Sequence, residues 1–186
     1  MIVAGCDVGS LTAKAVVLNQ TRILGYAVID ANTSPAHSAE EVLHKALALS
    51  QVGKNDIKHC VGTGYGREKI PFADRCISEL VCHAKGAQWI MPAVRTIIDI
   101  GGQDCKAIRV DAKGQIAKFY TNDKCASGTG RFLEVMADLM GITLEDLGQL
   151  SLKSKRPVSL ASACTVWAQA EIIRLVGERT PIEDIC

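Results

Sequence analysis

The sequence has no excess of charge of either sign, no long apolar run and no stretch of low complexity. Its 186 residues carry 21 basic and 20 acidic side chains, which gives a formal net charge of +1. Such a balance offers no electrostatic reason to expect nucleic acid or an anionic membrane surface as a partner. The apolar runs are interrupted by polar residues well before they reach the length of a membrane span. We therefore expect a protein that binds neither nucleic acid nor membrane.

A signal peptide and a Cys-x-x-Cys pair are also missing. Residues 1–7 have no charged leader and no cleavage site and are typical of a strand, which favours a cytoplasmic protein. In that reducing compartment, eight cysteines indicate buried thiols, metal ligands or redox groups rather than disulfides. Without a Cys-x-x-Cys pair there is no self-contained zinc or ferredoxin motif. Cys6 and Cys60 lie within apolar strand patterns, so we expect them to be buried as small hydrophobic side chains.

Hydrophobic residues make up 48% of the chain, and their spacing predicts an α/β protein. Ser38, followed by Glu41 three residues later, is the expected N-cap of the first helix. Trp89 and Trp167 are expected to pack in the core. The helices are expected at residues 39–52, 78–90, 130–140 and 165–177, and the first strands at residues 2–8, 13–19, 22–30 and 58–63.

One pattern occurs twice, about 90 residues apart. Residues 3–9 and 96–102 each consist of an apolar strand, an Asp, one apolar residue and a Gly. Two more strand patterns follow each copy. This repetition indicates an internal duplication and two similar α/β lobes. We place the first lobe at residues 1–92 and the second lobe, with the second hairpin and the cysteines discussed below, at residues 93–186.

The repeated turn has the residues that bind a nucleotide phosphate and its metal ion. A carboxylate at a strand end, as at Asp7 and Asp99, can hold a hydrated Mg²⁺ through water. The glycine two residues later lets backbone amides come close to phosphate oxygens. Two such hairpins could hold the β- and γ-phosphates from both sides, although either motif alone is compatible with an ordinary hairpin turn.

The second hairpin also contains two side chains that could act on an attacking water. Gln103 and Asp104 could position metal, water or phosphate, and such a water needs orientation and charge stabilisation more than a strong base. The first hairpin adds the hydroxyls of Ser10 and Thr12 and the positive charge of Lys14. The expected catalytic set is Asp7, Asp99, Gln103 and Asp104.

Two cysteines stand immediately before predicted helices. Cys125 precedes the Gly128-Thr129-Gly130 segment, and Cys164 precedes Thr165, a possible N-cap. A helix N-terminus favours negative charge, such as that of a thiolate-bound iron–sulfur cluster. A cluster normally needs four cysteines, and a two-fold symmetric dimer would supply four from these two. On these residues alone, buried structural thiols are the alternative.

Six segments, in chain order, closely resemble the activators of 2-hydroxyacyl-CoA dehydratases. The wider family includes the ATP-binding subunits of benzoyl-CoA reductase. The resemblance runs along essentially the whole chain, and its cysteine-containing block is highly specific. The segments are Asp7–Ser10, Thr63–Arg67, Ile77–Leu80, Ile98–Asp104, Asn122–Leu133 and Cys164–Val166.

The resemblance implies a fold, a cofactor set and a reaction. The fold is the duplicated ribonuclease H-like α/β fold of the acetate kinase/sugar kinase/Hsp70/actin superfamily. The family forms a homodimer, or a pair of similar subunits, around one [4Fe–4S] cluster, whose ligands match Cys125 and Cys164. The cluster accepts an electron from reduced ferredoxin or flavodoxin. ATP binding and hydrolysis, with Mg²⁺, then drive that electron to an acyl-CoA dehydratase or reductase.

The resemblance also implies nucleotide contacts. They match Gly9, Ser10, Leu11, Thr12, Ala13 and Lys14, then Gly101, Gly102 and Gln103, and finally Gly128, Thr129 and Gly130. Family members continue beyond the segment that this chain covers, so we expect a C-terminal truncation and an incomplete second lobe.

A small-molecule kinase of the same superfamily, such as an N-acetylglucosamine-type sugar kinase, is the alternative function. It would need a carboxylate base near a sugar hydroxyl. At the place where such a base is expected, this chain has Cys125–Gly128, a segment without a carboxylate, and this favours the electron-transfer ATPase.

Overall fold

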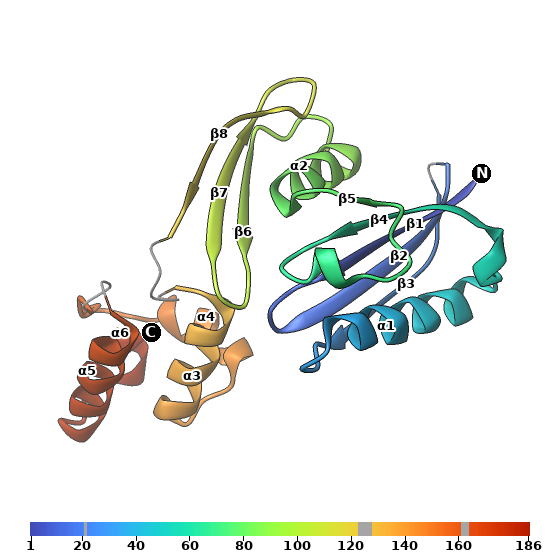
Figure 1. The fold of residues 1–186 in the computed structure, drawn as a ribbon. Coiled ribbons are helices and arrows are strands. Elements are labelled where there is room, and N and C mark those ends of the chain that lie inside the picture. Colours follow the sequence, from blue (N-terminus) through green and yellow to red (C-terminus); the bar gives the residue numbers. More distant parts are fainter. Residues whose placement is uncertain (21, 123–127, 161–163) are drawn as a thin grey trace. The chain divides into compact units, whose positions relative to one another are not determined.

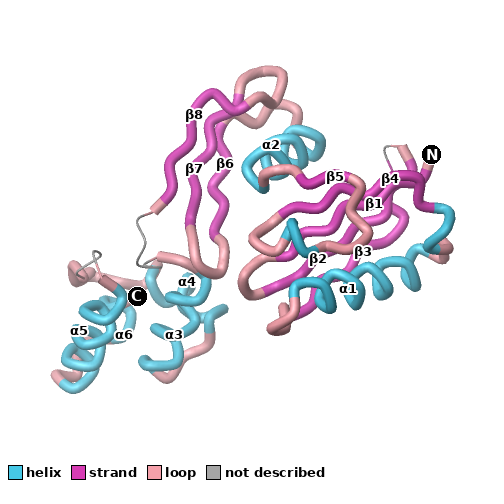
Figure 2. The backbone as a smooth tube through the Cα atoms, viewed as in Figure 1, coloured by secondary structure: helices cyan, strands magenta, loops and turns pink. Residues whose placement is uncertain are grey.

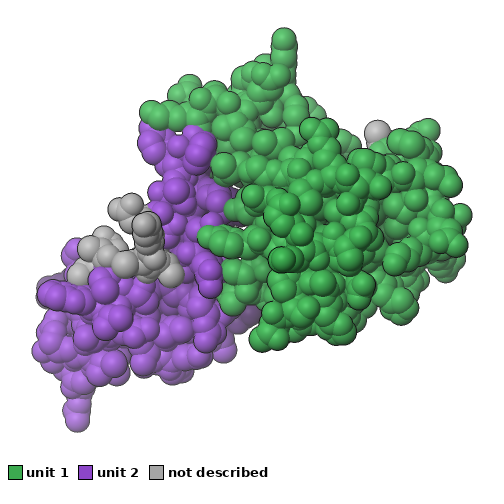
Figure 3. All heavy atoms as spheres, viewed as in Figure 1, with its two compact units in different colours: residues 1–97, 108–118 green, residues 98–107, 119–186 purple. Residues whose placement is uncertain are grey.

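A computed structural model describes residues 1–20, 22–122, 128–160 and 164–186 of the chain. The chain divides into two compact units, and each is described by itself (Figure 3). Unit 1 comprises residues 1–97 and 108–118, and unit 2 comprises residues 98–107 and 119–186. The helices within the described residues are all too short or too polar to cross a membrane.

Unit 1 is built on a five-stranded mixed sheet (Figure 1). The strand order is β3-β2-β1-β4-β5. The pairs β1–β2 and β2–β3 are antiparallel, whereas β1–β4 and β4–β5 are parallel. The strands are β1 (Ile2–Val8), β2 (Thr12–Asn19), β3 (Arg22–Asp30), β4 (Ile57–Thr63) and β5 (Arg75–Cys76).

Helix α1 (Pro35–Ser50) covers one face of this sheet and forms the main core with it. Alternate residues of β1 face the helix, because successive strand residues point to opposite faces. Cys6 and Cys60 belong to this core with exposed fractions of 1% and 3%, which confirms that both are buried. Burial raises the pKa of Cys6 to about 12 and that of Cys60 to about 11. Both thiols therefore stay protonated at neutral pH.

Helix α1 begins earlier than the sequence pattern predicted. Its N-cap is Ser34, whose hydroxyl accepts a hydrogen bond from the His37 amide, and Pro35 occupies the first turn. The prediction of Ser38 as the N-cap was wrong. Ser38 lies inside the helix, is fully buried, and accepts a hydrogen bond from the Asn32 amide at 3.0 Å.

Helix α1 and strand β3 approach each other closely at Gly25. A Cβ at this position would lie 2.7 Å from the Ser50 amide nitrogen and 2.8 Å from the Ala46 carbonyl oxygen. Since real Cβ atoms do not come this close to backbone, any larger residue would push the helix away from the sheet. A glycine is therefore required here by packing rather than by its backbone angles.

Unit 1 also includes short helical turns, and a second sheet, of order β6-β7-β8, has residues in both units. Helix α2 packs on this sheet around Ala84, Ile108 and Val110. The division between the two units passes through the strands of the sheet. The elements are η1 (Lys54–Asp56), η2 (Arg67–Lys69), α2 (Glu79–Ile90), β6 (Thr96–Ile100), β7 (Cys105–Val110) and β8 (Ile116–Thr121).

Unit 2 contains four helices in the part that the structure describes (Figure 2). They are α3 (Gly130–Met140), α4 (Leu144–Ser151), α5 (Thr165–Gly177) and α6 (Ile182–Ile185). The core of these helices is small and centres on Met136, Ile172, Leu175 and Ile185. Helix α4 did not appear among the predicted elements, although Thr143 and Asp146 form its N-terminal cap.

Asp184 ties the loop before α5 to the end of unit 2. Its Oδ1 atom accepts hydrogen bonds from the Ser154 hydroxyl and from the amides of Lys155 and Arg156, at 2.8 to 2.9 Å. These bonds hold the pKa of Asp184 below its ordinary value, and the bond from the Arg156 amide has the largest effect.

Both tryptophans are more exposed than expected. Trp89 is 49% exposed and Trp167 is 72% exposed, so the prediction that they pack in the core was wrong. Helix α5 shows the reason, because it buries Ala168, Ile172 and Leu175, and Trp167 falls outside that set.

The predicted helices and strands otherwise occur within a few residues of their expected positions. The division into lobes at residues 92 and 93 stays a prediction. Lobes defined by duplication need not coincide with compact units, and here the units divide inside the second repeat.

Candidate functional site

The first repeated hairpin joins β1 to β2 and is closed by a hydrogen bond from the Gly9 amide to the Thr12 carbonyl, at 3.0 Å. Asp7 and Lys14 are cross-strand partners, and Lys14 Nζ lies 3.5 Å from Asp7 Oδ2. The Lys14 side chain is 42% exposed, so its ammonium can leave the carboxylate at little energetic expense. The hairpin thus combines a carboxylate, an adaptable cation and a short loop.

The loop that follows β4 supports this hairpin. The Gly66 amide donates to the Val8 carbonyl at 2.8 Å. Gly64 has φ +87°, and a Cβ there would collide with Asp7 Oδ1 and the Val8 carbonyl. Glycine is required at position 64 both for its backbone angle and for this close approach.

Thr63 places an unsatisfied hydroxyl beside Asp7. The two residues are neighbours on the parallel strands β4 and β1. Within the described part of the chain, Thr63 Oγ1 is buried and has no hydrogen-bond partner. A buried hydroxyl next to a carboxylate suits a bound water, and therefore a metal ion that keeps its hydration shell. The residues at this position fit the predicted Mg²⁺ bound to Asp7 through water.

The second hairpin joins β6 to β7 and repeats the geometry of the first. The Gly101 amide donates to the Asp104 carbonyl at 2.8 Å, as Gly9 does to Thr12. Lys106 lies seven residues after Asp99, as Lys14 does after Asp7, and its Nζ is 3.8 Å from Asp99 Oδ2. The same ammonium is 2.6 Å from Asp104 Oδ1.

Lys106 was missed in the sequence analysis. Its signal was the spacing from Asp99, which equals the spacing from Asp7 to Lys14. The Lys106 side chain is only 9% exposed, and those of Asp99 and Asp104 are 18% and 25% exposed. The second hairpin therefore holds two carboxylates and one ammonium in a mostly buried cluster.

Helix α3 begins directly on the second hairpin. The Gly130 amide donates to the Gly101 carbonyl at 2.9 Å. Thr129, the N-cap, is fully buried, and its hydroxyl accepts from the Phe132 amide at 3.3 Å. The structure therefore brings together two of the three predicted nucleotide-binding segments, those around Gly101 and Gly130. Amides at a helix N-terminus suit a phosphate group.

The other predicted residues of the two hairpins take different positions. Gln103 is exposed at the second hairpin, beside Gly102, whereas Ser10, Leu11 and Thr12 are partly buried. The Ala13 side chain is fully buried in the core, so this residue can offer a ligand only its backbone. Because the hairpins lie in different units, their opposition across a nucleotide stays a prediction.

Only one of the two predicted cluster ligands lies within the described residues. Cys164 is the N-cap of α5, and its side chain makes no capping hydrogen bond. Thr165 was the predicted cap, which was wrong, since it is the first helical residue. Cys125 lies outside the described residues. No three His, Cys, Asp or Glu side chains within the described ranges gather as a metal site.

Cys105 differs from a cluster ligand in its chemistry. Its Sγ donates a hydrogen bond to the Gly128 carbonyl at 2.9 Å. Burial, followed by the charges of Asp104 and Asp99, raises the pKa of the Cys105 thiol. It therefore stays protonated at neutral pH, whereas a metal-bound cysteine is a thiolate.

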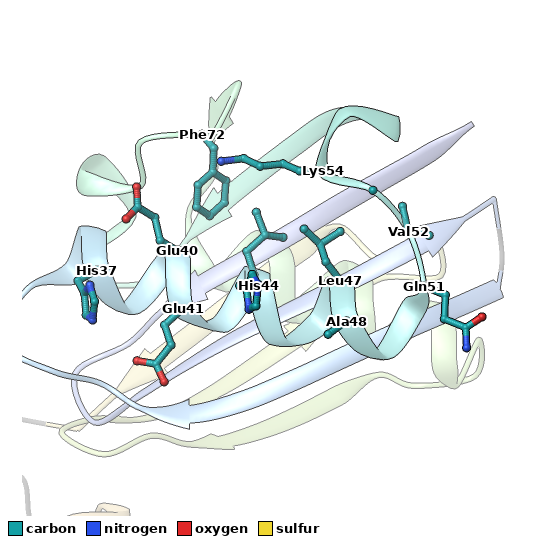
Figure 4. Close-up of a pocket in the computed structure, with 12 residues that line it drawn as sticks. His37, Glu40, Glu41, His44, Leu47, Ala48, Gln51, Val52, Lys54 and Phe72 are labelled. Carbon is teal, nitrogen blue, oxygen red and sulfur yellow. The ribbon is translucent and has the colours of Figure 1, made fainter.

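Unit 1 has hollows on its surface in which a ligand could fit. One of about 590 Å³ is lined by Asp7, Lys14 and Thr63 together with apolar residues of the sheet. Another, of about 820 Å³, runs along α1 and is shown in Figure 4. Its lining includes His37, His44 and Phe72 but no predicted site residue. The hollow beside the first hairpin is thus the one that agrees with the sequence.

Similarity to characterised proteins extends over the whole chain. The chain is 44% identical over 186 residues to the 2-hydroxyisocaproyl-CoA dehydratase activator of Clostridioides difficile, covering 100% of this chain and 70% of that protein. It is 47% identical over 174 residues to the activator of lactoyl-CoA dehydratase of Anaerotignum propionicum, covering 93% and 67%.

Two solved structures have the same fold. One is component A of the (R)-2-hydroxyglutaryl-CoA dehydratase of Acidaminococcus fermentans, with a TM-score of 0.90 and 39% identity, covering 100% of this chain and 71% of that one. The other is the Clostridium difficile activator with bound ADPNP, with a TM-score of 0.89 and 44% identity, covering 100% and 69%. These matches confirm the predicted α/β fold class of the acetate kinase/sugar kinase/Hsp70/actin superfamily. With residues 4–185 also matching as a whole, the chain belongs to the BadF/BadG/BcrA/BcrD ATPase family.

Proposed function

We propose that this protein is an ATPase that activates an acyl-CoA dehydratase or reductase by delivering one electron at a time. The observation that carries the proposal is its identity of 44% to a 2-hydroxyisocaproyl-CoA dehydratase activator along the entire chain. The paired Asp–Lys hairpins support it, because each has the groups needed for nucleotide chemistry. Activation of a 2-hydroxyacyl-CoA dehydratase is the more specific form of the proposal.

The first hairpin has the features of a phosphate-binding element. Lys14 is 42% exposed, and its contacts within the described residues are with Asp7 and the Thr12 carbonyl, so it can turn to a phosphate oxygen. The closed turn at Gly9 lets the amides of Ser10 to Lys14 approach the phosphates. Asp7 and Thr63 would hold a hydrated Mg²⁺ through its waters, and this ion would neutralise charge on the phosphates.

The second hairpin has the features that orient an attacking water. Asp99 and Asp104 are fixed by Lys106, and Gln103 stands exposed between them in sequence. An amide and a carboxylate can align a water for in-line attack without removing its proton fully. The N-terminal end of α3, next to Gly101, would stabilise negative charge on the phosphates through the dipole of the helix.

In this proposal Cys125 and Cys164 of each protomer hold one [4Fe–4S] cluster across a homodimer. The cluster would supply one-electron redox chemistry at low potential. Cys164 fits a ligand role, since it is partly exposed at the N-terminus of α5, where the helix favours a negatively charged group. Two thiolates per protomer need the second protomer to complete the site.

The proposed activity also needs an electron source and a partner enzyme. Reduced ferredoxin or flavodoxin is the proposed electron source, and the reaction is placed in the cytoplasm. The reductase alternative follows from the wider family, which the chain matches over residues 4–185. A sugar kinase of the same superfamily stays the alternative function, and it would transfer phosphate to a hydroxyl rather than to water.

Anaerobic purification tests the proposal directly. We expect brown protein with about four iron and four sulfide per dimer, and loss of iron in both Cys125→Ser and Cys164→Ser. Cys186→Ser, a cysteine outside the proposed site, is the matched control and should keep its iron. Iron retained in the Cys125/Cys164 double variant, or an iron-loaded monomer, contradicts the cluster. Colourless protein that phosphorylates a sugar would establish the kinase instead.

A further inference from the structure

The second hairpin contains a lysine that is almost out of contact with solvent. Lys106 is 9% exposed, and its Nζ lies 2.6 Å from Asp104 Oδ1 and 3.8 Å from Asp99 Oδ2. A buried ammonium is strongly unfavourable without a partner, and two carboxylates this close repel each other without a cation. The three side chains therefore stabilise one another as a unit.

The corresponding lysine of the first hairpin is held differently. Lys14 lies 3.5 Å from a single carboxylate, and its side chain is 42% exposed. Position 12, which corresponds to Asp104 in the repeat, is a threonine and offers Lys14 only its carbonyl oxygen, at 3.5 Å. The same residue type at the same place in the duplication is thus loosely held in one copy and tightly held in the other.

We propose that Lys106, unlike Lys14, does not bind phosphate but is a positioning residue, which fixes Asp99 and Asp104 for their work on the nucleotide. The proposal rests on the nucleotide-binding role given to the two hairpins above. A short contact with Asp104 and near-complete burial leave Lys106 little freedom to move to a ligand. Its contribution therefore passes through the two carboxylates.

A double-variant cycle on the ligand-free protein tests the unit itself. We expect Lys106→Met to lower the melting temperature by about 4 °C or more, because it leaves two mostly buried carboxylates together. Adding Asp104→Asn to Lys106→Met should recover part of that loss, since it removes one of the two charges. Lys14→Met, the matched control, should shift the melting temperature by less than about 2 °C. Additive effects of the two substitutions at 104 and 106 would overturn the proposal.

Nucleotide binding separates positioning from direct phosphate contact. The probe is ADP in the absence of Mg²⁺, measured by calorimetry. We expect Lys106→Met to change the ADP dissociation constant less than about twofold, and Lys14→Met to weaken it about tenfold. Hydrolysis of Mg·ATP should fall about tenfold or more in Lys106→Met and recover largely in Lys106→Arg, which keeps the positive charge.

If Lys106→Met and Lys14→Met weaken the binding of ADP equally in the absence of Mg²⁺, Lys106 binds phosphate itself. That result would overturn the proposal. If the unaltered protein binds no ADP, the proposed ATPase function fails, whereas the stability cycle still decides whether Lys106 organises the carboxylates. The two failures are therefore distinguishable.

Discussion

The two repeated hairpins have the same backbone but differ in how firmly their charged side chains are held. Both are closed by a hydrogen bond from a glycine amide to the carbonyl three residues later, and both have a lysine seven residues after the aspartate. In the first, Lys14 has one carboxylate and substantial exposure. In the second, Lys106 has two carboxylates and is mostly buried.

We interpret this difference as a separation of the two proposed tasks, phosphate binding and the positioning of water. Replacing one residue type, a threonine at position 12 against an aspartate at position 104, changes a lysine from an adaptable cation to a fixed one. Binding a phosphate needs a group that can move to the ligand, whereas orienting water needs a group that does not move.

The largest effect is expected at the two strand-end carboxylates. Asp7→Asn and Asp99→Asn should each lower ATP turnover by at least about a hundredfold, because both groups are proposed to bind the waters of Mg²⁺. Asp99→Asn should also lower the melting temperature, since it removes a partner of the buried Lys106. Phosphate release and thermal unfolding measure the two effects. Asp111→Asn is the control. ATP turnover above about a tenth of that of the unaltered protein, in either Asp7→Asn or Asp99→Asn, contradicts this assignment.

The support of the first hairpin should be the next most sensitive feature. Gly64→Ala places a Cβ against Asp7 Oδ1 and the Val8 carbonyl at a positive φ, and we expect a loss of about 3 kcal/mol in the free energy of unfolding. Gly86→Ala is the control, because a Cβ there meets nothing within 4 Å. Urea unfolding measures both, and a loss below about 1 kcal/mol at position 64 would mean that the hairpin adapts.

The contact between the second hairpin and the start of α3, made by the Gly130 amide, should have a smaller effect. Gly130→Pro removes the N–H that donates to the Gly101 carbonyl, while proline is otherwise favoured in the first turn of a helix. We expect a cost of about 1 to 2 kcal/mol and weaker nucleotide binding. Gly130→Ala keeps the amide and serves as the comparison. Identical behaviour of the two variants would show that this hydrogen bond does not hold the hairpin.

The smallest effect is expected in the stability of unit 2 at low pH. The pKa of Asp184 lies below its ordinary value of 3.8 in the folded chain, so its contribution to stability is present above pH 3.8 and is lost as pH falls through the lowered value. Asp184→Asn should remove this part of the acid dependence of unit 2. Fluorescence of Trp167 in a Trp89→Phe background reports on it. An unchanged acid transition would exclude Asp184 as its source.

The regular elements and the repeated hairpins were predictable because they depend on local patterns. The alternation of apolar residues and the spacing of Asp and Gly are visible in the chain itself, and the strands lie where those patterns place them. The burial of Cys6 and Cys60 followed from the same alternation.

Two of the errors arose where neighbouring residues were competing candidates for the same role. Ser34 was the better cap than Ser38, because Pro35 follows it and Ser38 is needed inside the fold to accept a bond from Asn32. In α5 the buried position is Ala168, and the neighbouring Trp167 lies outside the buried stripe of the helix. Hydrophobicity alone does not identify which side of a helix is covered.

The role of Lys106 could not be seen from its residue type. Lysines are usually exposed, and only the fold shows that position 106 is enclosed by Asp99 and Asp104. The spacing of seven residues was present in the chain, but it becomes informative only when both hairpins are known to share one geometry.

The contact at Gly25 limits how unit 1 can move. At this point the backbone of β3 lies directly against the C-terminal turn of α1, with no room for even one methyl group between them. A shift of β3 relative to the helix would bring these backbone atoms into collision, so β3 and the C-terminal end of α1 are expected to move together.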